Sequence, residues 1–254
     1  MENATINLIH QHASVRHYKP DPIPVPVIET IVRAGQCAAS SYNMQAYSVI
    51  AVTDAGKRAQ LADICGNQHQ IAEAPVFLAW CVDLARTERI CALREKPQVS
   101  RYLENFLLGV TDTIIAAQNA ILAAESLGYG TCYIGSVRNH PGQVIELLAL
   151  PRLVFPLTGM TIGVPIKPGR IKPRLPLEAA LHWERYEPEP QSSLFEYNRA
   201  MIDTGIFHDR KTPVPGKPDE MEDYGWMEHT ARSLSKEMRT DLLSQIQAQG
   251  LALE

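Results

Sequence analysis

Four short apolar runs along the chain have the length and composition of buried β-strands. The run VFLAWCV is apolar throughout, which is typical of a strand that is covered on both faces of its sheet. The run YSVIAVT is rich in β-branched residues and is followed by Asp54 and Gly56, residue types that favour turns. The predicted strands span residues 47–53, 76–82, 129–136 and 156–165.

Apolar residues at helical spacing predict helices between and around these strands. The longest such segment, residues 102–127, contains polar residues such as Asp112 and Glu125, so a helix through the middle of the domain fits it better than a membrane span. Gly128 follows it as a C-terminal stop. The other predicted helices span residues 3–12, 27–37, 55–64, 142–150, 194–202 and 227–249.

Proline-rich segments separate these elements, because each proline fixes φ and lacks a backbone donor. Residues 165–176 hold four prolines and four cations without an acid, which predicts an ordered, extended, basic loop. The composition changes after Trp183, and residues 216–225, GKPDEMEDYG, have the composition of a mobile segment.

The order of these elements predicts a fold class. Strands separated by helices, with several strands beside short turns, predict a three-layer α+β arrangement around a mixed sheet. We expect a core over residues 1–185 and a helical extension over residues 186–254 that packs on the core or on a partner subunit.

Composition and charge exclude several classes of protein. The 254 residues carry 24 basic and 28 acidic side chains, a net charge of −4. The composition therefore lacks the excess of basic residues that is typical of proteins that bind nucleic acid. The N-terminus lacks the basic start and apolar run of a signal peptide, and the five cysteines include no C-x-x-C pair. These features predict a cytoplasmic protein with reduced thiols and no membrane association.

Well-known motifs of catalysis and nucleotide binding are missing. The sequence has no G-x-G-x-x-G after a strand, no Walker loop and no G-x-S-x-G elbow. No histidine stands in an H-E-x-x-H pattern, so we expect no metal site.

Three clusters of residues remain as candidates for binding a ligand. His12, Ser14 and Arg16 alternate in an extended segment, so they can converge on one anion. In the second cluster, Lys172-Pro173-Arg174, proline stiffens the backbone between two cations.

The third cluster is Tyr133-Ile134-Gly135-Ser136, which ends a strand with a glycine that permits close approach to a flat ligand. Each of the three clusters by itself is also consistent with a solvated turn or surface loop. Ser40, Ser41, Asn43, Gln45 and Gln68 add neutral hydrogen-bonding groups, and together the set suggests a planar cofactor anchored by its phosphate.

Five motifs occur in a characteristic order and spacing. They are H-A-S-V-R at 12–16, S-S-x-N-M-Q-A-Y-S at 40–48, AAQNAILAAESLGYG at 116–130, Y-I-G-S-V-R-N at 133–139 and K-P-R-L-P at 172–176. As a set they resemble the FMN-dependent nitroreductase family, in its branch of NADPH-flavin oxidoreductases and oxygen-insensitive major nitroreductases. The resemblance implies an intertwined homodimer whose mixed, mainly antiparallel sheet is flanked by helices, with FMN at the dimer interface.

The resemblance also implies site residues. The FMN contacts implied for this chain are His12, Ala13, Ser14, Val15 and Arg16; Gln68, His69 and Gln70; Tyr133, Ile134, Gly135 and Ser136; Lys172, Pro173 and Arg174; and Ser40 and Ser41 from the partner subunit. The nearest candidates for binding NADPH as co-substrate are Arg210 and Lys211. FMN then carries the chemistry, with a small-molecule electron acceptor and no catalytic side chain.

Two positions depart from the family pattern. Ala13 stands where the family usually has arginine, and Ser136 stands where it usually has a second glycine. We expect an NAD(P)H-dependent FMN oxidoreductase that acts on quinones, nitroaromatics, flavin or similar acceptors by a ping-pong scheme. The alternatives are a specialised member, such as a dehalogenase or a flavin-fragmenting enzyme, and a flavin-binding protein without turnover.

Overall fold

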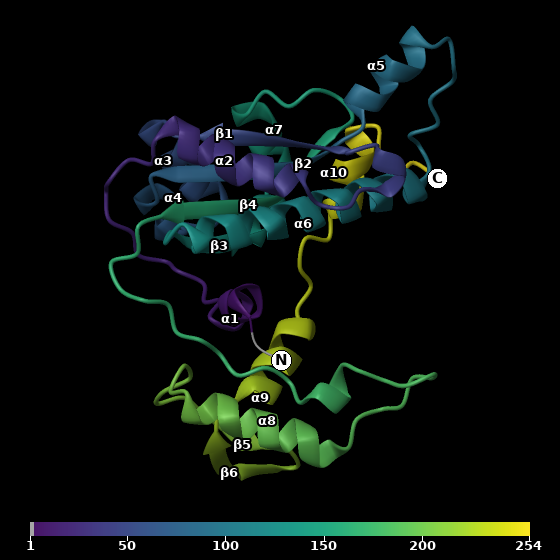
Figure 1. Ribbon diagram of the computed structural model, residues 1–254. Helices are drawn as coiled ribbons and strands as arrows, with labels where there is room; N and C mark the ends of the chain where they lie inside the picture. The colour runs from purple at the N-terminus through teal and green to yellow at the C-terminus, as the bar shows by residue number, and fades with distance from the viewer. Residues whose placement is uncertain (1–2) are drawn as a thin grey trace. The chain divides into compact units, whose positions relative to one another are not determined.

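The computed structural model describes residues 3–254, which form two compact units (Figure 1). One unit comprises the chain up to Arg170 together with Arg239–Glu254, and the other comprises Ile171–Met238. The chain therefore leaves the first unit once and returns to it, which differs from an expected single boundary after residue 185. Each unit is described separately below.

A four-stranded antiparallel sheet forms the centre of the first unit. Its order is β1 (Tyr47–Val52), β2 (Val76–Asp83), β4 (Val154–Gly163) and β3 (Gly130–Ile134). The expected α+β class with a mainly antiparallel sheet is confirmed. The parallel contribution is a single bridge between Ser14 and Thr131. Each predicted strand is present to within a few residues of its expected limits.

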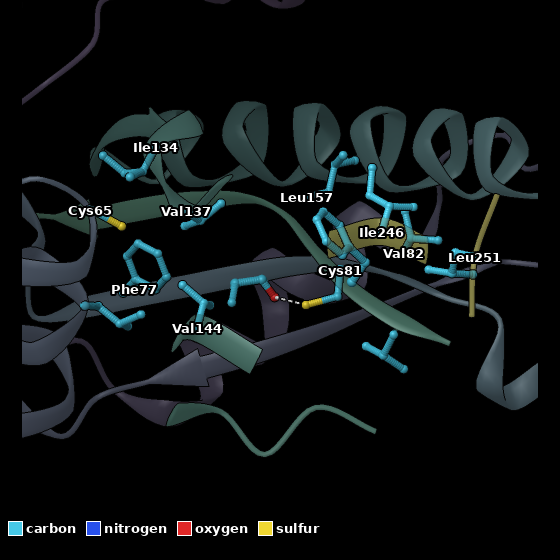
Figure 2. Close-up of a cluster of buried hydrophobic side chains, with 14 of the residues drawn as sticks. Cys65, Phe77, Cys81, Val82, Ile134, Val137, Val144, Leu157, Ile246 and Leu251 are labelled. Atoms are coloured by element: carbon cyan, nitrogen blue, oxygen red, sulfur yellow. Dashed lines mark hydrogen bonds between the residues drawn. The ribbon is translucent and has the colours of Figure 1, made fainter. Parts of the chain in front are cut away.

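Helices cover both faces of this sheet, as alternate residues of β2 demonstrate. Leu78 and Trp80 pack with Ile31 of α2 (Val25–Gln36) and Ile121 of α6 (Leu103–Ser126). On the opposite face, shown in Figure 2, the cluster combines sheet residues with helices α3 (Ala55–Ile64), α4 (His69–Glu73), α7 (Pro141–Leu147) and α10 (Leu242–Ala248). The expected three layers are therefore present.

Helix α6 packs into the core, as its polar interruptions predicted. By length and composition it could cross a membrane, the one described helix that could. Its residues Ala116, Ala120 and Ala124 are nevertheless fully buried in the core facing the sheet. A Cβ on Gly35 would lie 2.9 Å from the Ala116 carbonyl oxygen, so α2 approaches α6 this closely because residue 35 is glycine.

Most of the expected helices are present, including α1 (Ala4–His10), which Asn3 caps by accepting the Ile6 N–H. The single helix expected over 227–249 is wrong. The structure has α9 (Trp226–Leu234) in the second unit and α10 in the first, with a break between them. The sequence analysis also missed two helices, α4 and α5 (Ala85–Leu93). Helix α4 has five residues, too few to establish a period.

The second unit contains α8 (Gln191–Asp203), a hairpin of β5 (Lys211–Val214) and β6 (Lys217–Asp223), and α9. Most of residues 216–225 form β6, a strand that the sequence analysis did not predict, and the mobility expected for this segment stays a prediction. All seven residues of β6 are exposed, so the strand lacks the apolar alternation that predicts a sheet. The extended character expected for residues 165–176 is confirmed, since they form no helix.

Candidate functional site

The segment from His12 to Arg16 lies beside the edge strand β3. The Val15 N–H donates to the Thr131 carbonyl at 2.8 Å, next to the bridge between Ser14 and Thr131. Val15 is buried, and a Cβ on Gly130 would lie 2.6 Å from its Cγ2. The close fit of Val15 against the glycine holds the backbone of this segment, and with it Ser14 and Arg16, at a fixed place.

A cavity of about 410 Å³ opens beside this segment and is lined by cations. Its lining includes Arg16, Lys167 and Arg170, together with Ser14 and His17. The two chain segments that supply these residues approach closely, because a Cβ on Gly169 would lie 2.7 Å from the Cβ of Ala13. Three cations and a hydroxyl around one cavity form a site suited to a phosphate group.

His12 lies outside this lining. Its Nδ1 is 2.7 Å from Oε1 of Glu125 on α6, and the Thr131 hydroxyl donates to the same oxygen at 3.1 Å. Glu125 therefore ties the start of the segment to α6 and β3. The three residues His12, Ser14 and Arg16 do not all converge, because only the last two line the cavity.

At the end of β3, three side chains form a continuous hydrogen-bonded chain. Gln70 Nε2 donates to Gln68 Oε1 at 2.6 Å, and Gln68 Nε2 donates to Ser136 Oγ at 2.6 Å. Gln68, Gln70 and the strand end around Gly135 are thus brought together, as the sequence analysis expected. Ser136 and Gln70 are buried.

Tyr133 and Ile134 complete the strand end. Ile134 is buried in the core, while the buried hydroxyl of Tyr133 has no hydrogen-bond partner among the described residues. Burial raises the pKa of Tyr133 to about 12, so its hydroxyl is protonated at neutral pH. A buried donor without a partner is costly in an apolar setting and is typical of a site that a ligand completes.

His69 begins α4 and stacks on His17, with ring centroids 5.1 Å apart. Nδ1 of His17 is also 3.4 Å from Oε2 of Glu73. All three side chains are exposed. His69 therefore lies next to His17, which lines the cation-lined cavity.

The loop that carries Ser40 and Ser41 is fixed from behind by a carboxylate of α6. Asp112, 1% exposed, accepts the backbone N–H of Ser41 at 2.9 Å and that of Ala46 at 3.1 Å. Within the loop, Ser40 Oγ accepts the N–H of Gln45 at 3.0 Å. Three of its residues, Tyr42, Asn43 and Gln45, have positive φ. This strained conformation persists because Asp112 holds both of its ends.

The second unit has its own cation-lined cavity, of about 520 Å³. Its lining includes the expected Arg210 and Lys211 and, in addition, Tyr224, His229, Arg232 and Lys236. The guanidinium carbons of Arg210 and Arg232 lie 5.9 Å and 5.6 Å from the centroid of the Tyr224 ring. Lys211 Nζ is 2.6 Å from Asp223 Oδ1, so part of its charge is already neutralised.

Lys172, Pro173 and Arg174 also belong to the second unit. There Arg174 Nη1 donates to the Lys172 carbonyl at 2.8 Å, and the Tyr197 hydroxyl donates to the Pro173 carbonyl at 3.3 Å. These bonds order the loop without using the Lys172 ammonium group.

The comparison with known families divides the chain near the start of the second unit, but its second match also includes Arg239–Glu254, which belong to the first unit. Residues 9–164 match the Nitroreductase family, and residues 172–254 match the C-terminal domain of that family.

The chain belongs to the nitroreductase family.

Nitroreductase relatives cover nearly the whole chain. An oxygen-insensitive NADPH nitroreductase of Salmonella typhimurium is 36% identical over 249 residues, which is 98% of each chain. The structure of NfrA2 from B. megaterium is similar with a TM-score of 0.91 and 33% identity over the full length of both chains. The structure of the NADPH:FMN oxidoreductase from Vibrio harveyi in complex with NAD+ has a TM-score of 0.87 and 33% identity, and covers 99% of this chain and 100% of its own.

Sequence reasoning missed several residues of this nitroreductase that the structure places in the two cavities or behind the site. Lys167 and Arg170 lie in the basic loop that the composition indicated, but nothing distinguished them from its other cations. Arg232 and Lys236 lay in a segment interpreted only as helical. For Asp112 a signal existed, since it is an acid within an apolar helix.

Proposed function

We propose that the protein is an NADPH-dependent oxidoreductase that binds FMN and transfers a hydride to quinone, nitroaromatic, flavin or similar small acceptors. The observation that carries the proposal is the cavity that Arg16, Lys167 and Arg170 line together with Ser14. Its charge and size fit the phosphate end of FMN. The names of the Salmonella typhimurium and Vibrio harveyi relatives support the same reductant and cofactor.

In this proposal the chain's own residues bind and orient the cofactor. Arg16, Lys167 and Arg170 hold the phosphate in their cavity. Lys172 and Arg174 remain phosphate contacts that the family resemblance implies. The strand end at Tyr133–Ser136 and the side chain of Gln68 face the ring. FMN supplies the redox chemistry when bound, accepting a hydride from NADPH and passing two electrons to the acceptor. The protein therefore needs no nucleophile or metal, and one site that serves two substrates in turn predicts ping-pong kinetics.

A purified sample tests the proposed function directly. We expect a yellow protein with a flavin spectrum that oxidises NADPH in the presence of a quinone, with parallel lines in double-reciprocal plots. A protein that binds FMN but does not oxidise NADPH with any acceptor would instead be a flavin-binding protein without turnover. A sample that binds no FMN would overturn the proposal.

We further propose that the protein is a cytoplasmic homodimer. On α6, Leu103, Leu107, Ile114 and Ile115 are each 39% exposed or more, which leaves apolar surface for a second subunit to cover. The rigid loop around Ser40 and Ser41 is suited to contribute to a partner's site. Light scattering is expected to give about twice the chain mass of 28.2 kDa. A stable monomer that retains flavin would contradict this arrangement.

The cavity of the second unit predicts a preference for NADPH over NADH. Arg210 lies over Tyr224 and, unlike Lys211, has no ion pair recorded among the described residues, so its guanidinium remains available for a 2′-phosphate. Arg210→Ala is expected to raise KM for NADPH about tenfold or more, the effect of losing one charge-assisted contact, and to leave KM for NADH nearly unchanged.

Lys217→Ala is the matched control, because Lys217 pairs with Glu220 on the same hairpin and lies outside the cavity. Its steady-state constants for both nucleotides should match those of the wild type. Equal fractional losses of kcat/KM for NADPH and NADH in Arg210→Ala would show that Arg210 does not bind the 2′-phosphate.

A further inference from the structure

The basic loop after β4 runs antiparallel to the segment that carries Arg16. An antiparallel bridge joins Tyr18 to Pro165, and the Ile166 N–H donates to the His17 carbonyl at 3.1 Å. Because the two segments run in opposite directions, the loop continues past Arg16 towards the start of the other segment. The bridge and the hydrogen bond therefore fix the base of the loop beside the cation-lined cavity.

Further along the loop, the two backbones come into close contact. A Cβ on Gly169 would lie 2.7 Å from the Cβ of Ala13 and 3.1 Å from the Ala13 carbonyl oxygen. Two carbon atoms in favourable contact lie about 3.5–4.0 Å apart, so any side chain at position 169 would push the two segments away from each other. The close approach thus depends on glycine in the loop and on a small residue opposite it.

The loop cations stand directly beside this contact in the sequence. Lys167 and Arg170 are within two positions of Gly169, so a displacement of the Gly169 backbone moves both of them. They line the cavity together with Arg16, and this lining includes no acidic residue among those that the structure describes. Arg16 itself is held from the other side, because the Val15 N–H donates to β3. The place of Arg16 therefore does not depend on Gly169.

We propose that Gly169 and Ala13 are positioning residues for the phosphate of FMN, because their contact holds Lys167 and Arg170 in the cavity. The inference rests on the proposed function, since it requires the phosphate in this cavity. The family pattern has arginine at position 13, and that side chain would compete with Gly169 for the same space. In this chain the loop thus supplies the positive charge that an arginine at position 13 would supply from the opposite segment.

The test measures Kd for FMN by fluorescence titration of the flavin-free protein. Gly169→Ala is expected to weaken binding about tenfold, the effect of losing one charge-assisted contact. Ala13→Gly removes the atom that the new Cβ would meet, so the double variant Ala13→Gly/Gly169→Ala should recover to within about threefold of the wild type. Gly56→Ala is the matched control, because Gly56 lies in α3, outside the cavity, and its FMN affinity should equal that of the wild type.

A second comparison tests whether Gly169 acts through the two cations. The background for it carries both Lys167→Met and Arg170→Met, and it should bind FMN at least about tenfold more weakly than the wild type. In this background Gly169→Ala should change the affinity by less than about twofold, because the groups that it displaces are already gone. A further loss as large as in the wild-type background would overturn the inference, since Gly169 would then act by another route.

The outcomes separate this inference from the proposed function. Wild-type protein that binds no FMN would overturn the proposed function and the inference with it. Wild-type and Gly169→Ala proteins that bind FMN equally well would overturn the inference alone. A double variant that binds FMN as weakly as Gly169→Ala would also overturn it, because the contact with Ala13 would then not be what positions the loop.

Discussion

Asp112→Ala is expected to destabilise the protein by about 3 kcal/mol, because it leaves two backbone N–H groups in a largely buried setting without an acceptor. Asp112 is 1% exposed and accepts from Ser41 and Ala46. The loop between these residues has three positive-φ residues and depends on the carboxylate to keep that conformation. Urea unfolding measures the loss of stability, and a fall in flavin content should accompany it if the loop contributes to a partner's site.

Two further variants identify the cause. Asp112→Asn keeps one acceptor oxygen but turns an N–H₂ group towards the other donor. Its free energy of unfolding should therefore lie between those of the wild type and Asp112→Ala. Thr111→Ala is the matched control, since this neighbouring hydroxyl is exposed and bonds the Leu107 carbonyl of its own helix. If Asp112→Ala and Thr111→Ala unfold at the same urea concentration, the carboxylate does not hold the loop.

Arg16→Ala is expected to weaken FMN binding by about ten- to a hundredfold, the usual effect of losing one charge-assisted contact of about 1.5–3 kcal/mol. Arg16 is exposed at the edge of the cation-lined cavity and its backbone is fixed by the neighbouring Val15, so the fold should be unaffected. Lys172→Ala is expected to weaken FMN binding to a similar extent, because the family resemblance implies that Lys172 contacts the phosphate. Fluorescence titration with FMN measures both affinities.

Arg94→Ala serves as the control for Arg16→Ala, because Arg94 is an exposed arginine at the end of α5, outside the cavity. It loses the same charge without losing a contact to the cofactor. Unchanged FMN affinity in both Arg16→Ala and Lys172→Ala would mean that these cations are solvated loop residues.

The core could be predicted from the sequence because its signals are local. Each buried strand is a short apolar run, and α6 has a helical pattern over many turns and a glycine at its end. The hairpin of β5 and β6 has no such pattern. Strand β6 is highly charged and is exposed throughout, β5 buries only Thr212, and cross-strand contacts such as that between Lys211 and Asp223 accompany the pairing. Contacts of that kind depend on the turn that brings two charged segments together.

The candidate site could be predicted only in part, for a related reason. The order of short motifs was sufficient to suggest an FMN site near Arg16 and Ser136. It could not show that Gln68 bonds to Ser136, or that Lys167 lines the same cavity as Arg16, because these residues are far apart in the chain. His12 illustrates the opposite case, in which a residue of the correct motif forms a pair with Glu125 instead of lining the cavity.

The return of the chain to the first unit has a consequence for its synthesis on the ribosome. Helix α10 and the residues after it place Ile246 and Leu251 in the core, and the Leu103 N–H donates to the carbonyl of Glu254. Translation completes the second unit before Arg239–Glu254 has emerged. The part of the core that Ile246 and Leu251 cover therefore stays exposed until Arg239–Glu254 has emerged, and a nascent chain that stalls before Arg239 exposes this apolar surface to chaperones.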